Sequence, residues 1–143
     1  MQTLKTIDKF GQKHLFNYSV IANKIEGANA WEYHVFKEHE YEHFYINLLQ
    51  ISPQRILILY MGNNDHAAVS GKRIMDFMIP LLSERHQASI VSSSNLEAIK
   101  TSNWEGREEG ATIIWKRLNK QFDNVRYLEE EDRYVFEHLP SIS

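Results

Sequence analysis

The sequence predicts an α/β (α+β) domain, built on a mixed central sheet with helices packed on both of its faces. Residues 56–61 form an unbroken apolar run, which is typical of a central strand covered on both sides. An apolar stripe at helical spacing follows over residues 74–82. A short apolar segment, a second helical stripe and two strand-like segments complete the chain. Because strands and helices alternate in this way, some neighbouring strands are expected to run parallel.

The length and composition narrow the class of protein. At 143 residues the chain has the usual length of one domain, and residues 1–143 are treated as a single domain. Hydrophobic residues make up 43% and charged residues 24%, values that argue against intrinsic disorder. A net charge of −3 offers no basic field for a nucleic acid or an anionic membrane. Without cysteine, disulfides, thiolate zinc sites and cysteine nucleophiles are excluded.

The sequence shows no pattern of secretion or membrane insertion. Residues 1–8 lack the apolar run of a signal peptide. The longest apolar run, at residues 56–61, is far shorter than the ~20 residues that a spanning helix needs. We therefore expect a cytoplasmic protein.

The first half of the chain is predicted to contribute two strands. His14 to Ile25 is rich in apolar and aromatic residues, and residues 27–29 turn the chain into a second strand, Ala30 to Phe36. The alternation in this second strand places Trp31, Tyr33 and Val35 on one face and Glu32, His34 and Phe36 on the other.

The second half is predicted to alternate between helices and strands. Ser70 is placed to cap the first helix, and Pro80 is expected to kink it. Trp115 belongs to the apolar stripe of the second helix and is interpreted as a core anchor. The elements after the first helix are a strand over 88–91, a helix over 110–122, and strands over 125–128 and 133–138 around an acidic tip.

Two motifs follow the strands of this half. The chain reads His66-Ala67-Ala68-Val69-Ser70-Gly71 before the first helix and Asn95-Leu96-Glu97-Ala98 after the next strand. A helix start offers unpaired backbone N–H groups and the positive end of the helix dipole, which favour an anion. Together with the order of elements, these motifs resemble the acetyl-CoA-binding half of the GNAT acyltransferases over about residues 55–136.

The resemblance implies a coenzyme and a set of binding residues. In that family the central strand splays from its neighbour, and the loop after it presents backbone N–H groups to the coenzyme pyrophosphate. Asn95 would meet the pantetheine arm of acetyl-CoA, and Met61 marks the splayed end of the central strand. Carried onto this chain, the cofactor-binding residues are Met61, Val69, Ser70, Gly71, Lys72 and Asn95.

The sequence departs from the family pattern at several positions. His66 stands where the family has Arg or Gln, and Val69 stands in place of the first glycine, which leaves Gly71 as the second. Ser102 replaces a tyrosine that often acts as general acid, and the closing Gly-Phe signal is absent. The segment Gly106 to Leu118 is similar instead to a divergent group of phage and mobile-element proteins of this type.

The function that the resemblance implies is acyl transfer from acetyl-CoA to an amine of a small molecule or a protein. A base must take the proton of the amine, and donors must hold the developing oxyanion. No carboxylate interrupts residues 56–61, where a family base often lies. The predicted catalytic residues are therefore Glu32 and His34, on the polar face of a neighbouring strand.

Two other classes of function stay open. His39-Glu40-Tyr41-Glu42-His43 is a literal H-E-x-x-H, which on a helix places two His side chains on one zinc ion, and residues 41–49 have helical apolar spacing. Because Lys37-Glu38 precede it, we interpret it as a solvated turn of helix and assign no metal ligand.

The other class is a non-enzymatic binding or inhibitor protein, with a protein partner or a second copy. Aromatic residues, at 12%, suffice for both a core and an interface.

Overall fold

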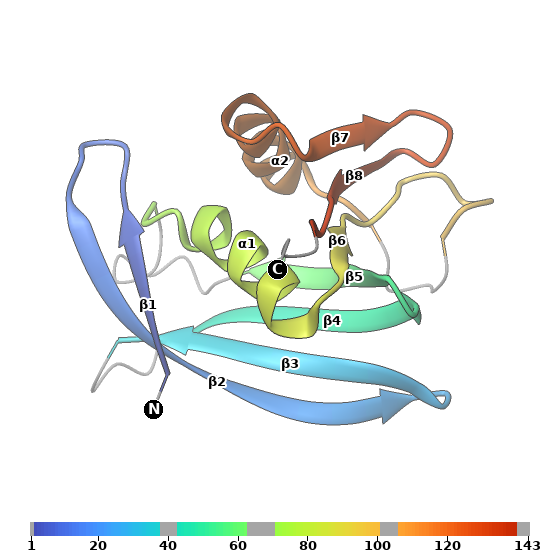
Figure 1. The fold of residues 1–143 in the computed structure, drawn as a ribbon, viewed down its shortest axis with the longest axis horizontal. Coiled ribbons are helices and arrows are strands. Elements are labelled where there is room, and N and C mark those ends of the chain that lie inside the picture. Colours follow the sequence, from blue (N-terminus) through green and yellow to red (C-terminus); the bar gives the residue numbers. More distant parts are fainter. Residues whose placement is uncertain (1, 38–42, 63–70, 101–105, 140–143) are drawn as a thin grey trace.

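The computed structural model describes residues 2–37, 43–62, 71–100 and 106–139, which form one mixed sheet and two helices (Figure 1). The strands are β1 (Gln2–Ile7), β2 (Lys13–Ile25), β3 (Ala28–Phe36), β4 (His43–Ser52), β5 (Arg55–Gly62), β6 (Ser89–Val91), β7 (Val125–Leu128) and β8 (Arg133–Phe136). The helices are α1 (Ile74–His86) and α2 (Glu109–Gln121). Within the described part of the chain, neither helix has the length and apolarity that crossing a membrane requires.

The sheet has the strand order β1-β2-β3-β4-β5-β6-β8-β7. Strands β1 to β5 form an antiparallel meander, whereas β5 and β6 run parallel and β8 is antiparallel to both β6 and β7. The β2–β3 turn places Glu26 and Gly27 at positive φ, as tight two-residue hairpins require. Parallel strands need a crossover, which α1 supplies between β5 and β6. The predicted mixed sheet with a parallel pair is therefore confirmed.

Both helices pack on the same face of the sheet. One core cluster joins Met78 and Leu82 of α1 and Trp115 of α2 to strand residues such as Tyr33 and Ile56. The opposite face carries a smaller cluster, and no helical residue among the described ones belongs to it. The prediction of helices on both faces is therefore wrong. The smaller cluster consists of Leu57, Leu59, Val91 and Val135, with Leu49, Ile51 and Leu128 packed against it.

Buried arginine, rather than a helix, organises this second face. Arg133 of β8 donates hydrogen bonds to the carbonyl oxygens of Ser92 at 2.8 Å and Ile99 at 3.3 Å. These bonds tie the segment after β6 to β8. Arg55 of β5 adds an ion pair with Glu131 at 3.2 Å. Loop segments therefore complete the face that the sequence had predicted to be covered by a helix.

Most predicted elements are confirmed within a few residues, but two strands are not anticipated. The β1 strand has no counterpart in the sequence-based prediction. Residues 43–52 form β4, so the helical interpretation of the apolar spacing in residues 44–49 is wrong, while residues 38–42 lie outside the described residues. Helix α1 begins at Ile74 and continues through Pro80. Arg73 occupies its cap position, so the prediction that Ser70 caps this helix is wrong; Ser70 itself lies outside the described residues.

Candidate functional site

The parallel pair at the centre of the sheet separates part-way along its length. Strands β5 and β6 pair at three positions, the last of which joins Leu57 to Val91. Strand β5 then continues to Gly62, whereas β6 ends at Val91. The second half of β5 therefore has no strand beside it on that edge within the described residues. Parallel strands that part in this way open a gap at their carboxyl ends, where ligands bind in open α/β sheets.

A cavity of about 800 Å³ occupies the region of this gap. Its walls come from the second half of β5, from the segment after β6 and from the first turns of α2. Apolar side chains, backbone and a few polar groups contribute together, as in small-molecule sites. The lining residues are Phe44, Ile58, Leu59, Tyr60, Met61, Gly62, Ser92, Ser93, Asn95, Gly106, Arg107, Glu108, Gly110, Ala111, Ile114 and Trp115.

A β-bulge shapes the cavity wall that β5 provides. Tyr60 pairs with Asn47 and Ile58 pairs with Leu48, so Leu59 has no partner on β4. Such a bulge bends the strand and disrupts the ladder locally, which is common next to binding sites. Across the gap, the Ser93 hydroxyl donates a hydrogen bond to the Ile58 carbonyl oxygen at 2.6 Å. One side-chain bond therefore connects the two walls where backbone pairing has ended.

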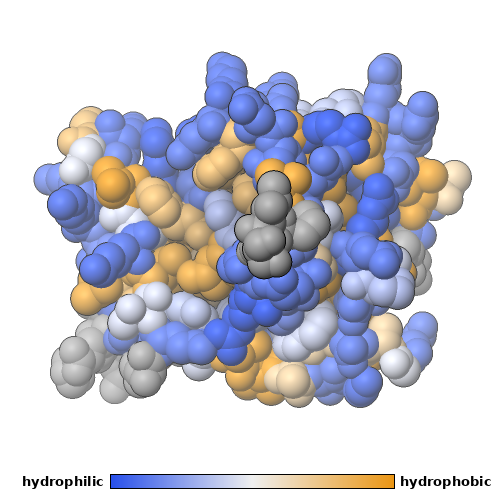
Figure 2. All heavy atoms as spheres, in the orientation of Figure 1, coloured by the Kyte–Doolittle hydropathy of each residue, from blue (hydrophilic) through white to orange (hydrophobic). Residues whose placement is uncertain are grey.

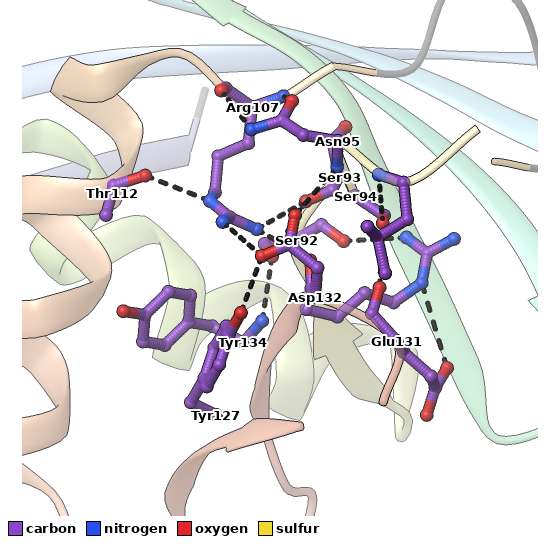
Figure 3. A network of polar contacts seen from close by, with 12 residues as sticks. Ser92, Ser93, Ser94, Asn95, Arg107, Thr112, Tyr127, Glu131, Asp132 and Tyr134 are labelled. Carbon is purple, nitrogen blue, oxygen red and sulfur yellow. Dashed lines mark hydrogen bonds and ion pairs between the residues drawn. The ribbon is translucent and has the colours of Figure 1, made fainter. Parts of the chain in front are cut away.

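Arg107 holds the segment before α2 in place (Figure 3). Its guanidinium donates to the carbonyl oxygen of Ser93 at 2.9 Å, to the carbonyl oxygen of Asp132 at 2.7 Å and to the Asp132 carboxylate at 2.7 Å. It also donates to the Thr112 hydroxyl at 2.9 Å and lies 5.4 Å from the centre of the Tyr134 ring. Five groups from three parts of the chain thus converge on one side chain.

Asp132 is the acidic centre of the same network. Besides Arg107, it accepts hydrogen bonds from the Tyr127 hydroxyl at 2.7 Å and from the backbone N–H of Asn95 at 2.9 Å. Burial opposes ionisation of this carboxyl, but the bonds from Arg107 and Tyr127 outweigh it and lower the pKa of Asp132. The network therefore contains an ionised carboxylate held against a cation beside the cavity.

Asn95 lines the cavity, as the coenzyme prediction requires, but its amide is engaged by the protein. The backbone N–H of Arg107 donates to the side-chain oxygen of Asn95 at 2.8 Å, and the side-chain NH₂ of Asn95 donates to the backbone carbonyl oxygen of Arg107 at 3.0 Å. This reciprocal pair satisfies one donor and the acceptor of the side chain. Asn95 thus fixes the cavity wall, and it would reach a ligand only with its remaining N–H.

A second, smaller cavity of about 280 Å³ adjoins the first, because Phe44 and Ile114 line both. Three basic residues, Lys9, Arg73 and Arg117, surround it. Their origins are the β1–β2 turn, the residue before α1 and the middle of α2. The remaining lining residues are Gly71, Ile74, Met75 and Asp76.

One of the three cations is already paired. Arg117 donates two hydrogen bonds to the buried Asp76 carboxylate, at 2.5 and 2.6 Å, which join α2 to the first turn of α1. The hydrogen bond that Arg117 donates to Asp76 raises the pKa of Arg117 despite partial burial. Since Asp76 neutralises Arg117, the excess positive charge among the described residues of this cavity comes from Lys9 and Arg73.

The predicted coenzyme-loop residues are described only in part. Gly71 has φ of +71° and lines the second cavity, so its backbone conformation is one that L side chains rarely adopt. Lys72 follows it and is partly exposed. Val69 and Ser70 lie outside the described residues. The glycine that matched the family pattern is therefore found beside the basic cavity.

Of the other predicted site residues, one lines a cavity and two do not. Met61 lines the first cavity and packs against the main core. Glu32 and His34 lie on β3, on the opposite face from Tyr33, with 3.5 Å between the Glu32 carboxylate and His34 Nε2. The His34 ring also contacts Tyr45, at 4.9 Å between centroids. Neither Glu32 nor His34 is among the residues that line the two cavities.

Sequence reasoning missed several residues that the fold brings to the cavities. Lys9 arrives from a turn near the start of the chain, and Arg107 and Glu108 arrive from the segment before α2. No local spacing marks these positions, since they meet only through the sheet order. Tyr60 was the one residue whose place in the sequence could have pointed to the cavity, because it is an aromatic residue near the end of the apolar run. In the structure it is exposed and lines the larger cavity.

Comparison of the chain with protein-family models, curated protein sequences and solved structures finds no match. Within the described residues, no group of three or more His, Asp or Glu side chains is arranged to hold a metal ion. The resemblance to the acyltransferases therefore stays a proposal, which the arrangement of β5, β6 and the two cavities supports.

Proposed function

We propose that this chain is a divergent GNAT-like acyltransferase, which moves an acetyl group from acetyl-CoA to an amine of a small molecule or a protein. The observation that carries the proposal is the separation of β5 from β6 after Leu57, with a cavity at the gap. The resemblance implies a splayed central strand of this kind, and it also implies that coenzyme binds along it.

The two adjoining cavities match the two ends of such a coenzyme. The larger one, with apolar walls and exposed backbone, suits the uncharged pantetheine arm and the thioester. The smaller one, with Lys9, Arg73 and the start of α1, suits the pyrophosphate, because positive charge and helix N–H groups both favour an anion. Phe44 and Ile114 line both cavities, so the cavities are neighbours, and one extended ligand would pass over these two side chains to occupy both.

The reaction needs a base, an acid and support for an oxyanion. The amine nitrogen attacks the thioester carbonyl carbon, the new C–N bond forms, and the C–S bond breaks to release the coenzyme thiolate. Glu32 and His34 do not line the cavity, so we assign the amine proton to Glu108 and protonation of the thiolate to Tyr60. Backbone groups of β5 beyond Leu57 would support the oxyanion.

A non-enzymatic binding protein is the second candidate. The small number of titratable side chains in the cavity lining favours it. Among the described lining residues, only Tyr60, Arg107 and Glu108 carry a titratable side chain. Arg107 is committed to the network around Asp132, and Asn95 is committed to Arg107. With so few free groups, the same cavity could hold acetyl-CoA without transferring its acetyl group.

Calorimetry of metal-free protein with acetyl-CoA, followed by an assay of thiol release with a panel of amines, separates the two candidates. Binding with thiol release supports the enzyme, and Glu108→Gln should then lower turnover more than affinity. Binding without release for any amine supports the binding protein. No heat and no thermal shift at millimolar acetyl-CoA would exclude both.

Gly71→Glu tests the position of the coenzyme phosphates. A carboxylate beside Lys9 and Arg73 would repel the phosphates and compete for their cations, so binding should be lost. Gly71→Ala is the matched control, because both side chains meet the same backbone strain at positive φ but only Glu adds charge. Equal loss in the two variants would mean that strain, and not the phosphate site, explains the effect.

A further inference from the structure

The turn between β1 and β2 presents an aromatic ring to solvent beside the basic cavity. Phe10 is 78% exposed, the highest value among the exposed large hydrophobic side chains of the described residues. Its neighbour Lys9 lines the smaller cavity, and the Lys9 ammonium lies 5.1 Å from the centre of the Phe10 ring. Figure 2 shows apolar surface on the side where the β1–β2 hairpin meets α1. An aromatic face and a cation are thus held together at the cavity edge.

The turn that carries Phe10 is held rigidly. One Asp8 carboxylate oxygen accepts hydrogen bonds from the N–H groups of Phe10 at 2.8 Å and Gln12 at 3.0 Å. The other meets His14 Nε2 at 2.8 Å, and Gly11 supplies a positive φ of 80°. The hydrogen bond from His14 is the main reason why the pKa of Asp8 falls to about 2. The carboxylate therefore stays ionised and the turn stays closed across the neutral range of pH.

A rigid turn that exposes a phenyl ring needs a physical explanation. Fixing Phe10 in water gains little from burial, since most of its surface remains wet. A turn whose backbone is already ordered, however, presents its ring to a planar base with a smaller loss of conformational freedom than an unordered loop. Stacking of a base on an aromatic side chain, together with a nearby cation, is how proteins hold nucleotides without reading their sequence.

We propose that the Asp8–Gln12 turn is a nucleotide platform, in which Phe10 stacks on the adenine of the coenzyme and Lys9 contacts its phosphates. The inference rests on the proposed coenzyme, and it assigns the nucleotide end of that ligand to residues outside the 55–136 segment of the resemblance. Arg73 lies on the same cavity and supplies a second cation for the phosphates.

The test uses adenosine 3′,5′-bisphosphate, the nucleotide end of the coenzyme, alongside acetyl-CoA. Phe10→Ala should weaken binding of both probes by about 5- to 150-fold, the range that base stacking gives. Phe10→Trp should keep the affinity, and Phe10→Leu should not, because a flat ring and not apolar surface is required. Lys9→Ala should weaken both probes and reduce the salt dependence of binding.

Matched controls come from the same hairpin. Leu15→Ala removes a 57% exposed apolar side chain from β2, and Lys13→Ala removes an exposed cation at its start; neither should change affinity. Thermal unfolding should be unchanged in Phe10→Ala, since the ring is exposed. A folded variant with wild-type affinity would overturn the platform while leaving the proposed enzyme intact.

The platform can also stand while the proposed acyl transfer fails. If the bisphosphate binds through Phe10 but acetyl-CoA is never turned over, the platform stands and acyl transfer does not. If the bisphosphate does not bind at millimolar concentration, or binds equally well to Phe10→Leu, the platform is overturned.

Discussion

At the scale of single residues, Arg107 shows how one side chain can fix a cavity wall. Its bonds reach the segment after β6, the β7–β8 turn and the first turn of α2, while its backbone engages Asn95. A guanidinium suits this task because its donors lie in a fixed planar fork. The same atoms explain why Asn95 is not free to act as the resemblance implies.

Replacing Arg107 by Ala should lower the free energy of unfolding by about 2–5 kcal/mol, since Asp132 would keep a largely buried charge without its cation. Lys should not restore it, because one ammonium cannot replace the fork. Denaturant unfolding measures the free energy of unfolding of the Ala and the Lys variant. Arg126→Ala is the control, because the Arg126–Glu137 pair is exposed and should contribute at most about 1 kcal/mol. Equal losses in the Ala variants would contradict a special role for Arg107.

Trp115 belongs to the same scale, and its predicted place in the core is confirmed. Its side chain is 1% exposed and stacks on Tyr134, with ring centroids 6.0 Å apart and planes 15° apart. It also forms part of the wall of the larger cavity. Packing and cavity shape are therefore coupled at this residue.

Trp115→Ala should cost about 3–5 kcal/mol of stability, because truncating a buried indole leaves a void. That is a large share of the roughly 5–15 kcal/mol that holds a typical domain together. Ile113→Ala on the same helix is the control, since Ile113 is 55% exposed and should change stability by no more than about 0.5 kcal/mol. A midpoint of denaturation near wild type for Trp115→Ala would instead make α2 a candidate interaction surface.

At the scale of elements, the last turn of α1 docks on β3 through ring contacts. His86 Nε2 lies 2.7 Å from the Tyr33 hydroxyl, and the His86 ring lies 4.4 Å from that of Trp31. Burial, with the charge of Arg85 second, lowers the pKa of His86, and burial raises the pKa of Tyr33 to about 12. Neutral His86 is therefore part of how the helix attaches to the sheet.

This attachment predicts a loss of stability in weak acid. Because the folded pKa of His86 is depressed, the unfolded chain binds the proton first as pH falls below the ordinary histidine pKa of 6.5. The stabilisation is thus present above pH 6.5 and is lost as pH falls through the folded pKa. His86→Phe keeps a ring on Trp31 but removes the titration, so its stability should vary less between pH 7 and 5. Identical pH profiles by denaturant unfolding would contradict this.

The β1–β2 turn is expected to lose stability over a different range of pH. Asp8 has its pKa lowered from 3.8 to about 2, chiefly by the hydrogen bond from His14. Its contribution is therefore kept above pH 3.8 and lost only as pH falls towards 2, which separates it from the His86 effect. Comparing the two windows in wild type and His86→Phe distinguishes the attachment of the helix from the closure of the turn.

At the scale of the whole molecule, one feature of topology creates the candidate site. The antiparallel meander delivers β5 to the centre of the sheet, and α1 then crosses to a β6 that ends at Val91, well short of the end of β5. The Asp76–Arg117 pair ties the two helices on the same face, so the cavities lie between elements that are fixed to each other. The gap beside β5 and the smaller, basic cavity therefore lie next to each other.

The sequence by itself determined the class of fold and most elements of the second half, because hydrophobic periodicity is a local property. It could not reveal β1, because the buried face of this strand consists of Leu4 and the polar Thr6, and the buried Asp8 follows directly, so no apolar alternation marks it. Nor could it separate helix from strand in β4, where Phe44, Ile46 and Leu48 alternate into the core while neighbouring aromatic residues also fit helical spacing.

Only the tertiary structure decided which face the helices cover and which residues meet at the cavities. Glu32 and His34 have the right chemistry for a base, but the pleat turns them away from the helix-covered face. Lys9 and Arg73 come from distant parts of the chain and share a cavity only because the β1–β2 turn lies beside the start of α1. Contacts between remote segments depend on strand order, which no local pattern of residue types encodes.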